Sequence, residues 1–336
     1  MKNDVNRQFR LKTRPTGRIE KSNFDFVDEP IPEPGKGEAL IRVLYLSLDP
    51  TNRIWMSDMD QYMPPVEIGE VMRGGGIGVV VKSNSARYKE GAYVSGLTGW
   101  QDYCIADEGM RAMSVLPDGL PVDLPVMLGA CGMTGLTAYF GLLELGRPKP
   151  GETVLVSAAA GAVGSVVGQI AKIKGCRAVG IAGGPDKCRH IVEDLGFDAA
   201  VDYKAKDWRE QLAAATPDGI DVNFENVGGE IMEAVMARMN LFSRMPLCGM
   251  ISGYNTGDPA MRGDFSPILM RRINVRGFIV IDFMEKFAEG TMQLAQWVME
   301  GKLKHRETIV DGLENAPVAV NRLFDGENIG KLVVKL

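Results

Sequence analysis

Hydrophobic and polar positions follow two different patterns along the chain, and the change comes near residue 126. Between residues 9 and 125, short β-branched or aliphatic runs such as 39–45, 76–81 and 92–95 are separated by Gly, Pro and Asn. Short, closely spaced runs of this kind are typical of antiparallel strands in a small barrel or sandwich. The sequence therefore predicts a mainly β domain in this part of the chain.

From residue 126 onward, apolar segments of strand length alternate with segments of helix length. A long helix is expected over 126–145, ended by Pro148 and Pro150. After it the pattern predicts strands over 153–157, 177–182, 199–203, 221–225, 245–251 and 275–281, and helices over 162–174, 187–195, 208–215, 230–239 and 287–301. Such an alternation indicates an α/β fold, a doubly wound parallel sheet with helices on both faces.

The last residues return to the first pattern. Residues 331–336 form a short alternating run, and we expect this strand to pair with the N-terminal strands. The parallel-sheet domain is then an insertion into the β domain. We expect residues 1–125, completed by about 305–336, to form the β domain, and residues 126–304 to form the parallel-sheet domain.

Composition and charge fit an ordinary globular protein. The 336 residues are 45% hydrophobic and 24% charged, and the net charge of −5 with scattered Lys and Arg gives no reason to expect nucleic-acid binding. The N-terminus lacks the apolar segment of a signal peptide. The uncharged stretch 153–171 contains glycines and serines that suit a strand, a turn and a helix better than a membrane span. The five cysteines are widely spaced, so we expect a cytoplasmic protein without a disulfide framework.

A glycine-bearing turn, Ala-Ala-Ala-Gly-Ala-Val-Gly at 158–164, lies between the first predicted strand of the parallel sheet and the next helix. A dinucleotide diphosphate needs close approach of the main chain and N–H groups at a helix N-terminus. We therefore expect Gly161, Ala162, Val163 and Gly164 to hold a diphosphate, although Ala159 replaces the first glycine of the usual fingerprint. A purely structural turn is the alternative, and the strand–turn–helix context favours nucleotide binding.

The end of the second predicted strand carries no carboxylate, which NAD-specific sites use to hold the adenosine ribose. The strand ends at Gly184, Lys187 follows, and Tyr203 ends the next strand. A cation without a carboxylate suits a 2′-phosphate, so the sequence predicts NADP(H). Asp186 supports the competing interpretation of an NAD site, and a solvated surface role is the alternative for Lys187.

Residues for other kinds of chemistry are scarce. The two histidines, His190 and His305, are not accompanied by the Cys and carboxylate pattern of a zinc site, and there is no GxSxG motif. This leaves hydride chemistry without a metal, in which the cofactor carries the reaction and the protein supplies geometry.

These features together resemble the medium-chain dehydrogenase/reductase superfamily, and within it the zinc-independent branch of prostaglandin reductases, leukotriene-hydroxy dehydrogenases and plant alkenal double-bond reductases. The motifs that carry the resemblance lie at 46–50, 132–139, 158–168, 225–229, 248–252, 254–255 and 326–331. The resemblance implies a Rossmann domain inserted into a GroES-like domain, and a homodimer paired through the edge strand 275–281. It also implies NADPH-dependent reduction of the carbon–carbon double bond of an α,β-unsaturated ketone or aldehyde.

The resemblance implies roles for individual residues along the cofactor. Lys187, Tyr203 and Gly184 would hold the adenosine 2′-phosphate end, Asn226 a ribose, Asn328 the diphosphate, and Phe278 and Val280 the nicotinamide, with Met133, Thr134 and Cys248 at the same site.

Two positions depart from the relatives. Met270 stands where they carry the Tyr that faces the substrate carbonyl, and Thr51 stands where they carry a second pocket Tyr. A donor is needed because negative charge grows on the carbonyl oxygen as hydride arrives, and Met cannot donate a hydrogen bond. Quinone reduction needs no carbonyl-specific donor and is the second candidate activity. A non-catalytic NADPH-binding protein is the third hypothesis.

Three residues remain as substitutes for the missing Tyr, unless the nicotinamide ribose hydroxyl acts alone. Tyr254 is the candidate catalytic donor, and Asn52 and Tyr62 are placed with Met270 in the substrate pocket. A loop position is the alternative for Tyr254 and Tyr62, and a turn cap is the alternative for Asn52.

Overall fold

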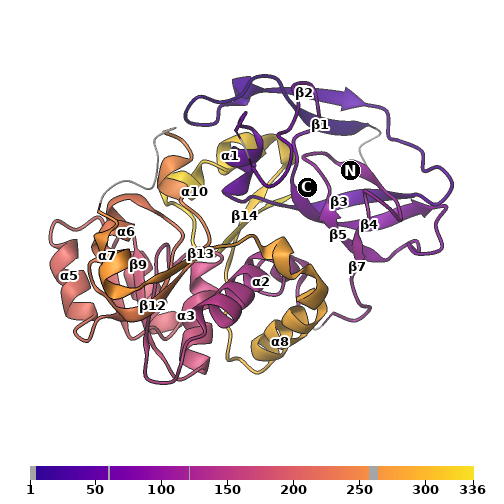
Figure 1. Ribbon diagram of the computed structural model, residues 1–336. Coiled ribbons are helices and arrows are strands. Elements are labelled where there is room, and N and C mark those ends of the chain that lie inside the picture. The colour runs from indigo at the N-terminus through magenta and orange to yellow at the C-terminus, as the bar shows by residue number, and fades with distance from the viewer. Residues whose placement is uncertain (1–4, 60, 121, 257–263) are drawn as a thin grey trace. The chain divides into compact units, whose positions relative to one another are not determined.

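The computed structural model describes residues 5–59, 61–120, 122–256 and 264–336. The chain divides into two compact units. The first comprises Met1–Leu128, Glu307–Glu327 and Leu332–Leu336, and the second comprises Gly129–Arg306 and Asn328–Lys331. Figure 1 shows both units and labels many of their strands and helices.

The first unit is mainly β. In its described part a sheet has the strand order β14-β15-β3-β4-β5-β7, with β6 also paired to β3, and β1 and β2 form a separate antiparallel pair. The strands are β1 (Asn6–Leu11), β2 (Phe24–Glu29), β3 (Ala39–Ser47), β4 (Gly75–Ser83), β5 (Tyr93–Leu97), β6 (Tyr103–Ala106), β7 (Ser114–Val115), β14 (Glu307–Asp311) and β15 (Lys331–Lys335). The C-terminal strand β15 runs antiparallel to β3, as the alternating run at the end of the sequence predicts.

Short helices complete the first unit. They are α1 (Thr51–Trp55), α9 (Ala316–Ala319) and α10 (Arg322–Asp325), with 3₁₀ turns at Lys21–Asn23, Leu124–Met127 and Leu313–Asn315. Aromatic rings dominate one core cluster, in which Trp100 is fully buried and stacks on Phe24 with ring centroids 5.5 Å apart. This core joins α1 and the C-terminal helices to the β strands.

The second unit contains a parallel sheet with the order β10-β9-β8-β11-β12-β13. Its strands are β8 (Thr153–Val156), β9 (Arg177–Ala182), β10 (Ala199–Asp202), β11 (Ile220–Phe224), β12 (Met239–Leu247) and β13 (Asn274–Gly277). Numbered from the first strand of the sheet, this is the order 3-2-1-4-5-6 of a Rossmann fold, and the direction of winding reverses between β8 and β11. The predicted doubly wound sheet is confirmed.

Helices cover both faces of this sheet (Figure 1). Side chains of α5, α6 and α7 share one hydrophobic cluster with the strands, while α2 packs against α3 and α8. The helices are α2 (Met133–Phe140), α3 (Gly164–Ile173), α4 (Pro185–Arg189), α5 (Trp208–Ala215), α6 (Gly229–Met236), α7 (Ser266–Arg271) and α8 (Phe287–Met299). Gly141–Gly146 and His190–Asp194 continue α2 and α4 as π-helical turns, and Ile251–Gly253 and Val280–Lys286 are 3₁₀ segments.

The helix predicted over 126–145 is wrong in its first part. A 3₁₀ turn ends at Met127, and α2 begins only at Met133 after a turn in which Gly132 has an extended conformation. Gly135 packs so tightly on this turn that a Cβ there would lie 1.9 Å from the carbonyl oxygen of Ala130. Glycines that looked like tolerated helix residues in fact allow the chain to turn and pack on itself.

Two predicted strands also have wrong boundaries, since those predicted over 245–251 and 275–281 span Met239–Leu247 and Asn274–Gly277. The strand predicted over 245–251 ends at Leu247, because the N–H groups of Cys248 and Gly249 bond the carbonyl of Glu225 and bend the chain towards a 3₁₀ turn. The strand predicted over 275–281 ends at Gly277. There the Asp282 carboxylate accepts the N–H of Ile279 at 3.1 Å and starts the next 3₁₀ segment.

Candidate functional site

The glycine-bearing turn follows β8 and leads directly into α3. Gly164 is the first residue of α3, and a Cβ there would lie 2.4 Å from the Ala158 carbonyl oxygen and 2.8 Å from Ala159 Cα. A Cβ on Gly161 would meet one neighbour, the Ala158 oxygen at 3.2 Å. Packing inside the turn therefore requires glycine at 164. At 161 a side chain would have more room within the protein, so glycine there leaves the outer side of the turn open. Ala162 and Val163 are half-buried between them.

A segment from the end of the chain lies beside this turn. Gly330 donates its N–H to the carbonyl of Ala160 at 2.8 Å, and Gly330 and Gly161 form a parallel bridge. The buried Asn328 donates its side-chain N–H to the Gly330 carbonyl at 3.1 Å. The structure thus brings Asn328 to the predicted diphosphate turn, about 165 positions away in the sequence.

Three predicted cofactor residues gather after β9 and β10. Gly184 has a φ of 93° directly before α4, and the ring of Tyr203 covers Gly183, where a Cβ would lie 2.8 Å from a ring carbon. Lys187 is half-buried in α4. Burial, and then repulsion from Lys204, lower the pKa of the Lys187 ammonium. Two cations therefore lie close enough to repel each other, as in a site for a dianion.

The competing NAD interpretation rests on Asp186. Its side chain is 85% exposed and lies 3.4 Å from the guanidinium of Arg189, three residues further on. An exposed carboxylate that faces its own helix is a surface ion pair rather than a ribose ligand.

Asn226 follows β11, the strand beside β8 at the point where winding reverses. Its backbone N–H donates to the Ser157 hydroxyl at 2.8 Å, and its side-chain N–H donates to the Ser157 carbonyl at 2.8 Å. Cys248, after β12, donates its N–H to the Glu225 carbonyl at 2.9 Å. Burial, with a smaller contribution from Glu225, raises the pKa of the Cys248 thiol to about 12, so it is un-ionised at neutral pH.

The residues expected at the nicotinamide differ in how they are placed. The Phe278 ring is buried, with its centroid 6.1 Å from that of Phe224 and 6.3 Å from that of Phe283. The ring therefore packs in the core, which favours a contact of its main chain over a contact of its side chain with a ligand. Val280 begins the following 3₁₀ segment.

Met133, Thr134 and Met270 also belong to the second unit. Met133 is 47% exposed at the start of α2, whereas the Thr134 hydroxyl donates to the Gly129 carbonyl at 3.1 Å. Met270 is 64% exposed on α7.

Tyr254 follows the 3₁₀ turn after β12. Its hydroxyl oxygen accepts the N–H of Met250 at 3.1 Å. This bond uses a lone pair of the hydroxyl oxygen.

Asn52 and Tyr62 lie in the first unit. Asn52 is 1% exposed, and its amide accepts the N–H of Asp49 at 2.8 Å and donates to the Arg73 carbonyl at 3.2 Å. These bonds favour the turn-cap alternative for Asn52. The Tyr62 hydroxyl accepts the Trp55 indole N–H at 3.1 Å and lies 2.5 Å from the Thr51 hydroxyl.

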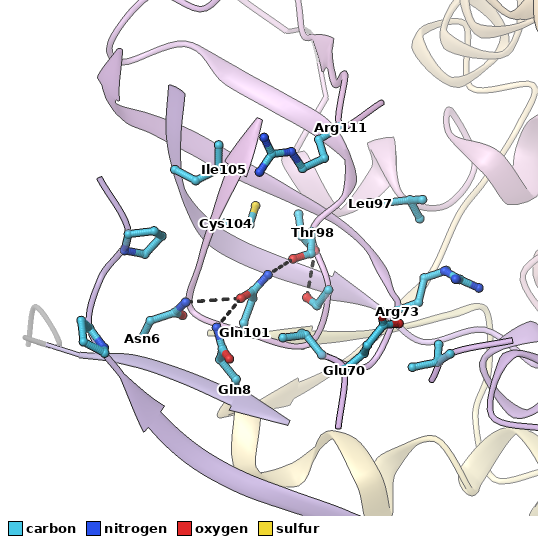
Figure 2. Close-up of a pocket in the computed structure, with 15 residues that line it drawn as sticks. Asn6, Gln8, Glu70, Arg73, Leu97, Thr98, Gln101, Cys104, Ile105 and Arg111 are labelled. Atoms are coloured by element: carbon cyan, nitrogen blue, oxygen red, sulfur yellow. Dashed lines mark hydrogen bonds between the residues drawn. The ribbon is translucent and has the colours of Figure 1, made fainter. Parts of the chain in front are cut away.

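A recess of about 550 Å³ lies within the first unit (Figure 2). At its centre the side-chain oxygen of Gln101 accepts the side-chain N–H groups of Gln8 at 2.9 Å and Asn6 at 3.3 Å. The side-chain N–H of Gln101 donates to the main-chain carbonyl of Thr98 at 2.8 Å (Figure 2). These three side-chain amides bond one another, and Arg73 and Arg111 at the rim bond Pro64, Asp107 and Glu38, so we assign the recess no ligand.

Among residues 5–59, 61–120, 122–256 and 264–336, no group of three or more His, Cys, Asp and Glu side chains could hold a metal ion. The His190 ring lies 2.6 Å from the carboxylate of Asp194, one helical turn away. No helix in the same ranges combines the length and the apolar character that crossing a membrane requires.

Three residues around the site escaped prediction from the sequence. Ser157 and Glu225 are fully buried beneath Asn226, and Lys204 lies near Lys187. A polar residue directly after each of two buried strands is the signal that could have found the first pair.

Comparison with known proteins adds the family. A profile described as the N-terminal domain of oxidoreductase matches residues 7–115, and one described as zinc-binding dehydrogenase matches residues 162–297. The NADPH-dependent curcumin reductase of Escherichia coli (strain K12) is 46% identical over 339 residues, which cover 98% of this chain and 97% of the relative. Prostaglandin reductase 1 of Mus musculus is 41% identical over 330 residues and 97% of each chain. The crystal structure of CurA from Vibrio vulnificus in complex with NADPH superposes with a TM-score of 0.93 at 46% identity, covering 98% of both chains.

Proposed function

Because this chain belongs to the zinc-independent branch of the medium-chain dehydrogenase/reductase superfamily, we propose that it uses NADPH to reduce the carbon–carbon double bond of α,β-unsaturated ketones or aldehydes. Two relatives over nearly the full length, a curcumin reductase and a prostaglandin reductase, support this activity. The observation that carries the proposal is the turn between β8 and α3, where Gly164 leaves no room for a side chain at the reversal point of a Rossmann sheet.

The second unit fits the cofactor. The diphosphate turn, Asn226, Lys187 and Tyr203 all follow the carboxyl ends of parallel strands, which meet at one edge of the sheet, and Asn328 reaches this turn through Gly330. The α3 N-terminus and Asn328 would hold the diphosphate, Asn226 a ribose, and Lys187 with Tyr203 the 2′-phosphate end. The main chain at Phe278 and Val280 would hold the nicotinamide. Bound NADPH supplies the hydride that is added to the β-carbon of the substrate.

The protein's part in the reaction is to stabilise charge on the substrate oxygen. As hydride reaches the β-carbon, negative charge moves to the carbonyl oxygen, and a hydrogen bond made at that moment lowers the barrier. We assign this bond to the Tyr254 hydroxyl, since Met270 has no donor. No metal ion takes part in the proposed mechanism.

The first unit would shape the substrate site, and the second would bind the cofactor. We further propose a cytoplasmic homodimer that pairs through β13, because the end strand of a sheet can extend into a second copy. A sedimentation measurement of the oligomeric state tests this part separately.

Quinone reduction is the second candidate, and the Met at position 270 favours it, because a quinone accepts hydride without a carbonyl-specific donor. The test is NADPH oxidation with a panel of enones, a panel of alkenals and a panel of quinones. Mass spectrometry of the product, heavier by two hydrogens and saturated at the double bond, would support the proposal. Turnover of quinones alone would support the second candidate. Tight NADPH binding without turnover of any panel would indicate a non-catalytic protein.

A further inference from the structure

A buried carboxylate joins the ends of the two strands between which the winding of the sheet reverses. Glu225, directly after β11, is 0% exposed. One of its oxygens accepts the Ser157 hydroxyl at 2.9 Å, the Val227 N–H at 2.7 Å and the Gly228 N–H at 2.9 Å, and the other accepts the Asn223 amide at 3.0 Å. A carboxylate with this many donors is satisfied without contact with solvent.

Ser157 extends this arrangement to Asn226. Because the Ser157 hydroxyl donates its proton to Glu225, its oxygen can accept the N–H of Asn226, at 2.8 Å. The carbonyl of Ser157 accepts the Asn226 side-chain N–H, also at 2.8 Å. These two bonds fix both the main chain and the amide plane of Asn226.

The same carboxylate also fixes the neighbouring elements. Val227 and Gly228 precede α6, so Glu225 satisfies N–H groups at the positive end of that helix. The main-chain carbonyl of Glu225 accepts the N–H groups of Cys248 and Gly249, which follow β12. The ends of β8, β11 and β12 are therefore held in one register by groups around Glu225.

We propose that Glu225 and Ser157 are positioning residues for the cofactor ribose and that they act through Asn226. This inference rests on the proposed NADPH site. Both side chains are 0% exposed, so they cannot touch the cofactor themselves. The contact that leads from these side chains towards the cofactor is the Ser157 hydroxyl, which holds the main-chain N–H of the half-buried Asn226.

The decisive experiment is a double-mutant cycle on the full chain. The dissociation constant of NADPH is measured by fluorescence titration for the wild type, S157A, N226A and S157A/N226A. Loss of the Ser157 hydroxyl removes the acceptor of the Asn226 N–H, and we expect NADPH to bind roughly 5- to 20-fold more weakly. In the N226A background the same change should have little further effect, because the side-chain amide that would contact the ribose is gone even though the main-chain N–H remains.

A purely structural role predicts a different outcome. If Ser157 only stabilised the fold, S157A would lower the melting temperature and leave the NADPH dissociation constant unchanged, or would weaken binding equally in both backgrounds. Either result overturns the proposal. The matched control is S243A, because Ser243 in β12 is buried like Ser157, at 1% exposed. Its hydroxyl donates to the carbonyl of Asn240 at 2.7 Å. We expect it to leave NADPH binding unchanged.

Glu225 is tested by two substitutions. E225Q keeps one acceptor oxygen, and its new N–H can bond the Asn223 side-chain oxygen, which is buried without a partner, once that amide rotates. We expect E225Q to bind NADPH like the wild type and E225A to bind at least as weakly as S157A. Failure of the wild type itself to bind NADPH would refute the proposed function, whereas normal binding by S157A refutes only this inference.

Discussion

The carboxylate of Asp202 accepts the backbone N–H of Gly184 at 2.7 Å, which ties the end of β10 to the turn before α4. The same oxygen accepts the N–H of Lys204 at 3.0 Å. One carboxylate therefore anchors both segments that carry the expected 2′-phosphate residues, Lys187 in α4 and Tyr203 after β10. It does this from the third strand of the sheet, and not from the second, where a carboxylate would select NAD.

Removing this anchor should loosen the phosphate end of the site. We expect D202A to lose about 1–3 kcal/mol of folding stability, because two backbone N–H groups lose their acceptor. NADPH binding should weaken while NADH binding changes less. D202N retains an acceptor oxygen and is the control. Chemical denaturation and titration with both dinucleotides measure these effects, and equal losses for NADPH and NADH would contradict the assignment.

Lys187 should determine the preference for the phosphorylated cofactor. A charge-assisted hydrogen bond contributes about 1.5–3 kcal/mol, so K187M should bind NADPH roughly 10- to 100-fold more weakly. Binding of NADH, which lacks the phosphate, should stay as in the wild type. Isothermal titration of both cofactors checks the prediction, and an equal loss for both would show that Lys187 supports the fold instead.

The pH dependence of NADPH binding follows from the same lysine. Burial and Lys204 lower the pKa of Lys187, so with rising pH its ammonium loses its proton earlier than an ordinary lysine does. The 2′-phosphate stays doubly charged above about pH 7. NADPH affinity should therefore fall as pH rises through this lowered pKa. K187R, whose guanidinium keeps its proton, should remove the decline.

The sequence predicts most of the parallel sheet because its central strands, such as β8 and β9, are short, mostly apolar runs next to turn residues. β9 and α5 match their predicted bounds, Arg177–Ala182 and Trp208–Ala215. The errors lie where a long-range contact overrides the local pattern. Leu247 ends β12 because Glu225, from another strand, accepts the next N–H groups. No local pattern carries such a contact.

In the candidate site, too, local signals are predicted from the sequence and long-range contacts are not. The turn around Gly161 and the cation at Lys187 are local signals, and both lie at the edge of the sheet that the alternation predicts. The Phe278 ring, in contrast, packs in the core, which depends on Phe224 from a distant strand as well as on the nearby Phe283. Sequence patterns predict which edge of the sheet carries the site better than they predict which atoms of a residue face it.

The two glycines of the diphosphate turn should respond differently to alanine. In G164A the new Cβ would overlap the Ala158 oxygen at 2.4 Å, and such overpacking costs about 1–3 kcal/mol of stability. In G161A the nearest atom is at 3.2 Å, so the fold should survive while the Cβ obstructs the diphosphate. Melting temperature should fall in G164A alone, and NADPH affinity should fall in both. Normal NADPH binding by G161A would remove this turn from the cofactor site.

Tyr254 should contribute to the reaction rather than to cofactor binding. In Y254F the substrate oxygen loses its proposed donor, and removal of one such donor costs about 10²- to 10³-fold in kcat. The NADPH dissociation constant should be unchanged. Because the Met250 N–H loses its acceptor at the same time, the melting temperature must be measured beside the kinetics. Y62F is the matched control, since the Tyr62 hydroxyl is bonded to Trp55 and lies beside Thr51. A loss of kcat in Y62F with none in Y254F would assign the donor to Tyr62, and full activity of both would leave the nicotinamide ribose hydroxyl as the donor.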